Sequence, residues 1–591
     1  MEEIAKKIQS IAAEVFDADI KVDVTVAPEG QKVDGRQAEF ASNVAMKLAG
    51  ILKMNPREAA EQIMSELRAD NEFSFDVEIA GPGFLNFIAR DEYWKQNLAN
   101  LAADFDKNIS SDEYSGKTVI CEFSDPNPFK VLHVGHLYTS IVGDAMSRLV
   151  EFAGGKVVRA NFGGDVGLHV AKTLYAVMRD NADTKDIETI AAKYVEGTRA
   201  YEDDEAAKAE ITKLNKLIYE IAEAGEEKDW NEDPEKKKVA ELYWQGRKVS
   251  YQYFEDFYKK VGVKFDKYYP ESTVAVRGLK EVKEHVGKVY EESNGAIIFP
   301  GEKYDLHTRV FINAEGLPTY EAKDVGLIFT KWDDYKFDES IVITGNDIID
   351  YMKVVLKSIS LYAPELVERT KHITHGNVRL PGNEKMSSRK GNFIKAIDVL
   401  NEVSELVSKS SKDEKTAEMV SMAAIKYAFL KYKIGGNIEF DAKESVSTTG
   451  NSGVYLQYSA VRARKILAAA SSSLADALLA QRTSSTPRSA TPASSNKPAA
   501  STSWSLNEHE KKLIRKLAQY KYILNEAAHD LTPHKLANYL FEAAQEFSRF
   551  YENVKVAGSE FETERAEIVK AYLNVMTHGL KLLGIEVPEA M

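Results

Sequence analysis

The stretch that most constrains this chain is "KTVICEFSDPNPFKVLHVGHLYTSIVGDAMSRLVEFAGGKVVRANF", residues 117–162. Its two ends are apolar and β-branched, as in buried strands, and its middle carries apolar residues at helical spacing. A strand, a helix and a second strand in this order predict a βαβ unit, which requires a parallel sheet. The turn from the first strand into the helix holds His133, Gly135 and His136.

This turn has the chemistry of a phosphate site. The first N–H groups of a helix lack partners and lie at the positive end of its dipole, so they favour an anion. Gly135 would let a nucleotide approach the backbone, and His133 and His136 could donate hydrogen bonds to phosphoryl oxygens. Taken alone, the pattern favours a capping or core histidine at a βα turn over a phosphate site.

A second motif, "NEKMSSRKGNFI", spans residues 383–394. It sets Lys385, Arg389 and Lys390 around two serines, with a glycine behind them. Such a loop is typical of a mobile cationic clamp for polyphosphate, although an ordinary basic surface loop would look the same in isolation.

Together the two motifs resemble the HIGH and KMSKS signatures of class I aminoacyl-tRNA synthetases, in the expected order within a Rossmann-type domain. The context most closely resembles arginyl-tRNA synthetase. Further landmarks of that family are "SDPNPFKVLHVGHL", "GDVGLH", "LPTYEAKDVG", "KMSSRKGNFI", "VSTTGNSGVYLQYSAVRARKIL" and "GLKLLGIEVPEAM". They run almost from end to end of the chain.

The resemblance implies an arginine–tRNA ligase that uses ATP, with substrate-bound Mg²⁺, to form arginyl-adenylate and then charges the terminal ribose of tRNA(Arg). It implies no metal held by protein side chains. The catalytic residues that it indicates are His133, His136, Lys130, Lys385, Arg389 and Lys390. The ATP-binding residues are His133, Gly135, His136, His375, Gly376, Lys385, Met386 and Ser387.

A buried guanidinium needs carboxylate or other acceptors, because an unpaired buried ion costs several kcal/mol. The resemblance assigns this task to Glu122, Asn127, Tyr320, Asp324 and Asp347. The i,i+4 spacing of Tyr320 and Asp324 would put both on one helical face, as it would for a surface helix pair.

The chain departs from the family pattern in several places. Ser388 replaces the second lysine of KMSKS, and Lys130 resembles an upstream lysine that compensates for it. The family's "SSPN" is "SDPN" here, which places Asp125 next to the arginine pocket, and "HLRS" is "HLYT". "GNDIID" carries Asn346 and Asp347 where bacterial members often have histidines.

For tRNA, the resemblance indicates an elbow-binding N-terminal domain and an anticodon-binding bundle. The residues that it assigns to tRNA are Asn43, Tyr455, Gln457, Tyr458 and Arg462. Phosphate contacts from basic side chains, with stacking on aromatic rings, suit an anticodon loop. Other candidates are Arg464, Lys465, Lys511, Lys512, Arg515 and Lys516, of which half or more could simply solvate helix faces.

Composition changes along the chain predict an α/β multidomain protein with three parts. Residues 1–112 form an N-terminal α/β domain, and residues 113–400 form the catalytic domain with a charged helical insertion at about 184–260. Residues 401–591 form an all-α bundle, interrupted at about 469–504 by a flexible Ser/Ala/Thr/Pro-rich segment.

Other properties exclude several classes. No apolar run approaches the about 20 residues of a membrane span, and the charged, periodic N-terminus is unlike a signal peptide, so we expect a cytoplasmic protein. We also expect it to act as a monomer. The single cysteine, Cys121, excludes an intrachain disulfide and a Cys-rich zinc site. A net charge of −14 does not favour non-specific nucleic-acid binding.

Two alternatives stay open. A cysteinyl or glutamyl synthetase shares both signatures, but the cysteinyl enzyme would need a zinc site and neither fits the N-terminal domain. A tRNA-binding protein that kept the scaffold and lost the chemistry is the second alternative. The intact His133, Gly135, His136 and Lys385 argue against that loss.

Overall fold

A computed structural model describes residues 2–27, 32–33, 36–379, 394–411, 413–483 and 504–591. The chain divides into two compact units. The first comprises 1–108, 466–519 and 546–574, and the second comprises 109–465, 520–545 and 575–591. The three-part division expected near residues 112 and 400 stays a prediction.

The second unit is built on a five-stranded, fully parallel sheet with the strand order β14-β13-β7-β8-β9. The strands are β7 (Thr118–Glu122), β8 (Lys156–Gly163), β9 (Lys267–Pro270), β13 (Glu339–Gly345) and β14 (Thr370–His375). Numbered along the chain, this is the order 3-2-1-4-5 of a Rossmann-type sheet. The predicted fold class is therefore confirmed.

The order of the strands reverses between β7 and β13, and such a switch point opens a crevice beyond the carboxyl ends of the strands. Helix α6 (Val134–Phe152) begins just after β7 and is buried along most of its length. The histidine turn therefore lies at the switch point. Cys121, in β7, is fully buried, and burial raises the pKa of its thiol to about 12, so it packs as a small apolar residue.

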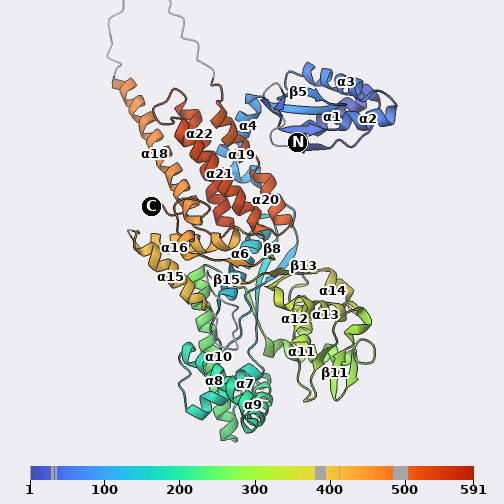
Figure 1. The fold of residues 1–591 in the computed structure, drawn as a ribbon, viewed down its shortest axis with the longest axis vertical. Helices are drawn as coiled ribbons and strands as arrows, with labels where there is room; N and C mark the ends of the chain where they lie inside the picture. The colour runs from blue at the N-terminus through green and yellow to red at the C-terminus, as the bar shows by residue number, and fades with distance from the viewer. Residues whose placement is uncertain (1, 28–31, 34–35, 380–393, 412, 484–503) are drawn as a thin grey trace, which may run out of the picture. The chain divides into compact units, whose positions relative to one another are not determined.

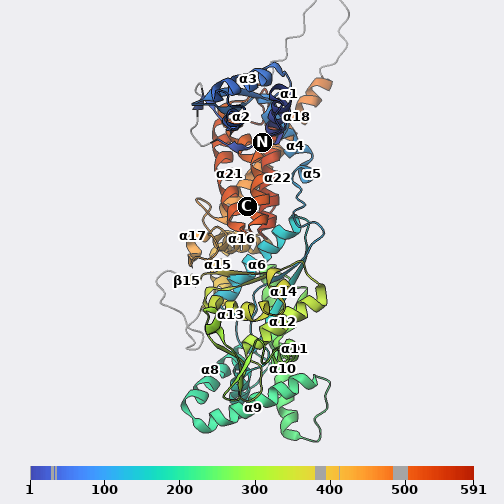
Figure 2. The ribbon, with the colours of Figure 1, turned by 90° about the vertical axis from the view of Figure 1, so that its right-hand side faces the viewer.

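A group of helices follows β8. Its members are α7 (Leu168–Asp180), α8 (Ile187–Asp203), α9 (Glu205–Ala224) and α10 (Pro234–Val261), which pack together in Figures 1 and 2. They share an apolar core that includes Leu174, Ile211 and Tyr243. Their outward faces carry the charged residues of the segment, as an amphipathic helix requires.

Between β9 and β13 the chain forms a small antiparallel sheet and two closely packed helices. The elements are α11 (Glu271–Glu284), β10 (Glu291–Ser293), β11 (Ala296–Phe299), η1 (Gly301–Tyr304), β12 (Arg309–Ile312) and α12 (Tyr320–Tyr335). Helices α11 and α12 lie side by side (Figure 1). They approach most closely at Gly278 and Gly326, since a Cβ on Gly278 would lie 3.3 Å from Gly326 N. A Cβ on Gly278 would lie 1.9 Å from the carbonyl oxygen of Ala322.

The rest of the chain is mostly helical, as predicted. These elements are η2 (Asn346–Ile348), α13 (Ile349–Ser360), α14 (Pro364–Glu368), β15 (Val378–Arg379), α15 (Ala396–Ser408), α16 (Glu414–Leu430), β16 (Ile438–Glu439), α17 (Ala442–Ser445), α18 (Gly453–Thr483), α19 (Glu508–Ala518), α20 (Tyr520–His529), α21 (Pro533–Asn553) and α22 (Glu562–Leu582). Helix α18 continues through the Ala- and Leu-rich residues after 469, which are good helix formers. Residues 484–503 of the Ser/Pro-rich segment lie outside the described residues.

In the second unit, three side chains hold the segment 584–588 by donating hydrogen bonds to its main-chain carbonyl oxygens. Lys426 Nζ donates to the carbonyl oxygen of Gly584 at 2.6 Å, and Gln457 Nε2 donates to that of Glu586 at 2.6 Å. Arg464 Nη1 donates to the carbonyl oxygen of Pro588 at 2.6 Å. Burial lowers the pKa of Lys426 to about 8.

The first unit contains an antiparallel sheet of order β1-β4-β6-β5 covered by helices. Its N-terminal elements are α1 (Glu2–Phe16), β1 (Val24–Val26), β2 (Lys32–Val33), β3 (Arg36–Gln37), β4 (Phe40–Ser42), α2 (Val44–Leu52), α3 (Pro56–Ala69), β5 (Phe75–Ala80), β6 (Phe84–Ala89), α4 (Asp91–Ala103) and α5 (Phe105–Ile109). Helices α1, α2 and α3 bury Ile8, Leu48 and Ile63 against the sheet. Across the described part of the chain, no helix is long and apolar enough to cross a membrane.

The Gly278 contact generates a test of the fold. Gly278→Ala would force the backbones of α11 and α12 apart, so we expect a loss of about 1–3 kcal/mol in the free energy of unfolding. Chemical denaturation measures this loss. Gly50→Ala is the matched control, because Gly50 is also helical but a Cβ there meets nothing within 4 Å. Equal stability of the two variants would contradict the observed helix packing.

Candidate active site

The histidine turn is locked by its own backbone. His133 is the N-cap of α6, and its Nδ1 accepts a hydrogen bond from Gly135 N at 3.1 Å. His136 Nδ1 accepts one from His133 N at 3.1 Å, which completes a capping box. The two rings stack with their centroids 3.8 Å apart. Capping and a phosphate-facing role are therefore compatible here.

These bonds fix where the imidazole protons lie. A backbone N–H can only donate, so both Nδ1 atoms must be unprotonated. Burial, followed by the charge of Lys130, lowers the pKa of His133 to about 4. Burial and His133 hold the pKa of His136 well below its usual value. Both rings are then neutral at pH 7 and carry their proton on Nε2, ready to donate.

The structure gives a second reason for a glycine at position 135, besides the expected approach of a nucleotide to the backbone. A Cβ at Gly135 would lie 2.8 Å from Cε1 and 2.9 Å from Nδ1 of His133. A side chain at this position would therefore displace the ring that caps the helix. The small residue serves the histidine geometry directly.

The second motif returns to the histidine turn. Val134 N donates to the carbonyl oxygen of Ile394 at 2.9 Å, and Ala396 N donates to that of Leu132 at 2.9 Å. The end of the "KMSSRKGNFI" motif and the residues just after it therefore pair with the start of α6. The sequence alone did not predict this pairing. The predicted Lys385, Met386, Ser387, Arg389 and Lys390 lie outside the described residues.

Further predicted groups for ATP gather at the same edge. Lys130 Nζ lies 4.5 Å from the ring centroid of Tyr194 in α8, and its charge lowers the pKa of both histidines of the turn. His375, at the end of β14, has Nε2 2.6 Å from Thr139 Oγ1. A Cβ at Gly376 would lie 2.2 Å from the carbonyl oxygen of Gly436, so close backbone packing explains this glycine.

Asp347 lies in η2, just after β13, and is exposed. Burial lowers the pKa of both His133 and His375, and the charge of Asp347 partly opposes this lowering. The structure thus puts Asp347 on the histidine side of the crevice. Its predicted contact with arginine stays a prediction.

The other residues predicted for arginine lie at the end of β7, in the turn that follows it, and at the start of α12. Asn127 Oδ1 accepts from Gly164 N at 3.1 Å. Asp324 accepts from the hydroxyl of Tyr351, and burial raises its pKa to about 8. Tyr320, one turn before Asp324 on α12, is 55% exposed.

Two buried ion pairs, which the sequence did not reveal, support this region. Lys331 Nζ donates to Glu122 Oε2 at 2.6 Å and to Ser340 Oγ at 3.0 Å. Lys323 Nζ donates to Glu271 Oε2 at 2.5 Å. Both lysines project from α12, and the sequence of this helix does not indicate their partners in distant segments.

Asp165 is a further residue that sequence reasoning left without a role. It is fully buried, and its oxygens accept from Arg247 Nε at 2.9 Å and from Ser272 N and Oγ at 2.9 and 2.7 Å. Asp165 therefore ties the end of β8 to α10 and to the first turn of α11. Its signal was the "GDVGLH" landmark.

The residues predicted for tRNA differ in exposure. On α18, Tyr458 is exposed and accepts from Arg462 Nη2 at 3.1 Å, while Tyr455 donates to the carbonyl oxygen of Ala544 at 3.3 Å. Gln457 is fully buried and donates to the carbonyl oxygens of Met419 and Glu586. The structure therefore gives Gln457 an internal role.

Two other basic residues that were candidates for tRNA contacts form ion pairs within the first unit. Arg515 Nη2 lies 2.6 Å from Glu39 Oε1, and Lys511 Nζ lies 2.9 Å from Asp91 Oδ1. These α19 charges bind the N-terminal part of the same unit. They are not simply solvated, and they join helix and sheet domain.

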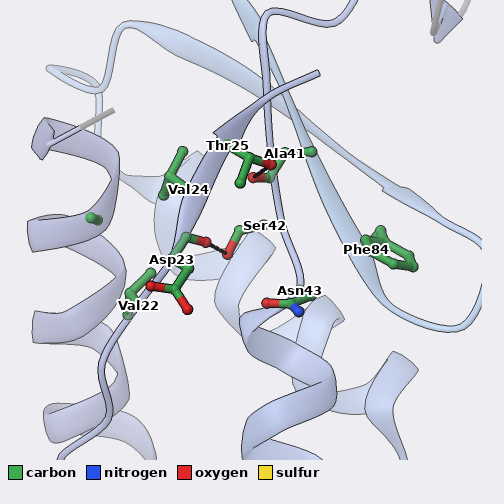
Figure 3. Close-up of a pocket in the computed structure, with 9 residues that line it drawn as sticks. Val22, Asp23, Val24, Thr25, Ala41, Ser42, Asn43 and Phe84 are labelled. Atoms are coloured by element: carbon green, nitrogen blue, oxygen red, sulfur yellow. Dashed lines mark hydrogen bonds between the residues drawn. The ribbon is translucent and has the colours of Figure 1, made fainter. Parts of the chain in front are cut away.

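Asn43 lies in the first unit, at the N-terminus of α2. It lines a pocket of about 650 Å³ together with Asp23, Ser42 and Phe84 (Figure 3). Ser42 Oγ donates to the carbonyl oxygen of Asp23 at 2.7 Å and so closes one wall. An amide, a carboxylate and an aromatic ring at one opening suit a polar, planar guest.

Comparison with known families identifies three successive regions. Residues 99–442 match "tRNA synthetases class I (R), catalytic domain". Residues 456–591 match the "DALR anticodon binding domain", and residues 2–89 match the "Arginyl tRNA synthetase N terminal domain".

Relatives of known name agree with these matches. The chain is 27% identical to an arginine–tRNA ligase of Porphyromonas gingivalis, over 95% of this chain and 96% of that one. It is 28% identical to one of Borrelia garinii, over 92% and 91%. In fold it resembles the arginyl-tRNA synthetase of Thermus thermophilus, with a TM-score of 0.71, 21% identity and complete coverage of both chains.

The protonation state of the turn can be tested directly. We expect His133 and His136 to stay neutral, with the proton on Nε2, from pH 8 down to about pH 5, because their pKa values are lowered. Nitrogen-15 NMR of histidine-labelled protein measures this, with His133→Gln and His136→Gln to assign the signals. An imidazolium signal from either residue at pH 6.5 would contradict the proposed geometry.

Proposed function

The chain belongs to the class I arginyl-tRNA synthetase family, and from this membership we propose how its residues carry out the reaction. The activity is that of an arginine–tRNA ligase, which uses ATP. In the first step the arginine carboxylate attacks the α-phosphorus of ATP, giving arginyl-adenylate and pyrophosphate. In the second, the 2′ hydroxyl of the terminal ribose of tRNA(Arg) takes the arginyl group.

One observation carries the assignment of roles. The histidine turn, the end of β14 and the residues that follow the cationic motif meet at the switch point of the parallel sheet. There the Nε2–H groups of His133 and His136 donate to the phosphates as negative charge develops during the transfer. Because both rings are neutral, they act as fixed dipoles and not as acids.

The cations complete the phosphate site. Lys130 stands beside the histidine turn, and Lys385, Arg389 and Lys390 belong to the segment that leads into Ile394. Mg²⁺ enters in this proposal as part of the ATP substrate, on its phosphates. Catalysis then consists of positioning and charge stabilisation, with no covalent enzyme intermediate.

The arginine site lies beside the phosphate site. Asn127 and Asp324 face the ends of β8 and β7, where the acidic groups around them favour a cationic side chain. Tyr320 lies one helical turn from Asp324 on the same helix face. For tRNA we propose the α18 surface at Tyr458 and Arg462, and the pocket at Asn43 in the N-terminal domain (Figure 3).

The function is tested by pyrophosphate exchange into ATP with each standard amino acid, with and without total tRNA. We expect exchange with arginine alone. A requirement for tRNA would further indicate coupling between the tRNA surface and the active site. Exchange with a different amino acid, or with none under either condition, would overturn the assignment.

His136→Ala tests the phosphate site. Losing one preorganised donor should lower the rate of adenylate formation about 10²–10³-fold while tRNA affinity stays nearly constant. Pre-steady-state pyrophosphate release and filter binding measure the two effects separately. An unchanged rate would remove His136 from the site.

Asp324→Ala tests the arginine site. The guanidinium would lose a charged hydrogen-bond acceptor, so the KM for arginine should rise about 10- to 100-fold while the KM for ATP changes little. Steady-state aminoacylation at varied arginine gives both constants. Normal arginine kinetics would show that Asp324 does not contact the substrate.

A further inference from the structure

Five acidic side chains converge between the end of β7 and the start of α12. This acid cluster consists of Glu122, Asp125, Glu271, Glu321 and Asp324, whose charges act on one another. So many carboxylates in a partly buried space require compensating cations, because like charges removed from water destabilise each other. Carboxylates of the cluster that lack a cation within the protein are therefore candidates to bind a cationic substrate.

Three of the five carboxylates have a cation. Glu122 is paired with Lys331 at 2.6 Å, and Glu271 is paired with Lys323 at 2.5 Å. Glu321 Oε1 lies 3.2 Å from Arg309 Nη1. Each of these pairs is formed within the protein itself.

Asp125 and Asp324 differ from the other three. Asp125 Oδ1 accepts from the backbone N–H of Phe162 at 2.7 Å, and Asp324 Oδ2 accepts from the hydroxyl of Tyr351. Within the described ranges of the chain, neither carboxylate forms an ion pair. Both residues keep some solvent exposure, whereas Glu122 and Glu271 are buried.

We propose that Asp125 is a specificity-determining residue, which together with Asp324 takes the guanidinium of the substrate arginine between two carboxylates. The inference rests on the proposed function and names an additional residue for its arginine site. A guanidinium presents five N–H donors in a planar fork, so it can serve two carboxylates at once. A substrate with a neutral side chain would leave both acids without a cation.

The backbone supports this placement. Ser124 and Asp125 have φ of +75° and +48°, a left-handed conformation that aspartate tolerates better than most residues. This bend turns Asp125 toward the end of β8, where Phe162 N holds one of its oxygens. A conformation of this kind costs free energy, and function is a common reason to keep it.

The structure also gives Asp125 and Glu122 different roles, although the family resemblance assigns Glu122 to arginine. Glu122 is only 3% exposed, and Lys331 already neutralises it. Adding a second cation there would require breaking a buried ion pair, which costs several kcal/mol. Glu122 therefore acts through Lys331 to position α12, and Asp125 offers the open carboxylate.

The protonation of the two acids agrees with this arrangement. Burial, then the charges of Glu122 and Asp324, raise the pKa of Asp125, while the Phe162 N–H and Lys331 oppose the rise. Burial raises the pKa of Asp324 to about 8. Without substrate Asp324 is largely protonated at neutral pH, and the raised pKa of Asp125 favours its protonated form as well, so a bound guanidinium would displace protons. Arginine affinity should therefore fall as the pH falls below about 8.

The test compares Asp125→Asn with the wild-type enzyme. The amide keeps an oxygen for Phe162 N but removes the charge, so we expect the KM and the Kd for L-arginine to rise about 10- to 100-fold. The KM for ATP and the midpoint of thermal unfolding should change little. Asp266→Asn is the matched control, because Asp266 is exposed and accepts the N–H of Arg159 on the same strand.

Calorimetry adds a readout that a merely structural role would not move. Titration of L-arginine at pH 7 in two buffers of different ionisation enthalpy should show proton release by the wild-type enzyme and less release by Asp125→Asn. Unchanged arginine affinity and proton release in Asp125→Asn, with an active wild type, would overturn this inference and leave the proposed function intact.

Two further outcomes are decisive. A larger loss of arginine affinity in Glu122→Gln than in Asp125→Asn, at equal thermal stability, would return the role to Glu122 and overturn the inference. A wild-type enzyme that exchanges pyrophosphate with another amino acid, and not with arginine, would overturn the proposed function together with it.

Discussion

Helix α12 is held across the carboxyl edge of the sheet by two buried ion pairs, and the geometry of the substrate crevice depends on them. Lys331 reaches Glu122 at the end of β7, and Lys323 reaches Glu271 just after β9. Removing one partner of such a pair leaves a buried charge, so the pairs fix position more than they add stability. By positioning α12, the two ion pairs also fix the position of Asp324 relative to the end of β7.

The sequence predicted the parts of the site that depend on local order. A βαβ unit with two histidines in its first turn determines that His133 and His136 lie at the carboxyl end of a parallel strand. The parallel sheet and the helical C-terminal part could be predicted for this reason. Asn127 and His375 were indicated by the family resemblance, and the structure holds them by contacts to Gly164 and Thr139.

Partnerships between distant residues could not be predicted. Lys331 and Glu122 are 209 residues apart, and nothing in either segment indicates the other. Gln457 is a polar residue on a helix, yet it is fully buried and donates to the carbonyl oxygen of a residue 129 positions downstream. Helical spacing shows which residues share a face, but not which face meets another part of the chain.

The anchorage of residues 584–588 has a consequence for how this protein can evolve. Lys426, Gln457 and Arg464 all grip carbonyl oxygens of the main chain, which every amino acid provides. The side chains of the segment contribute nothing to these three bonds, so the exposed Glu586 can vary, whereas Gly584 at φ +69° and the buried Ile585 cannot vary freely. The three donor side chains fix the path of the main chain, and substitutions there would be harder to accommodate than a substitution of Glu586.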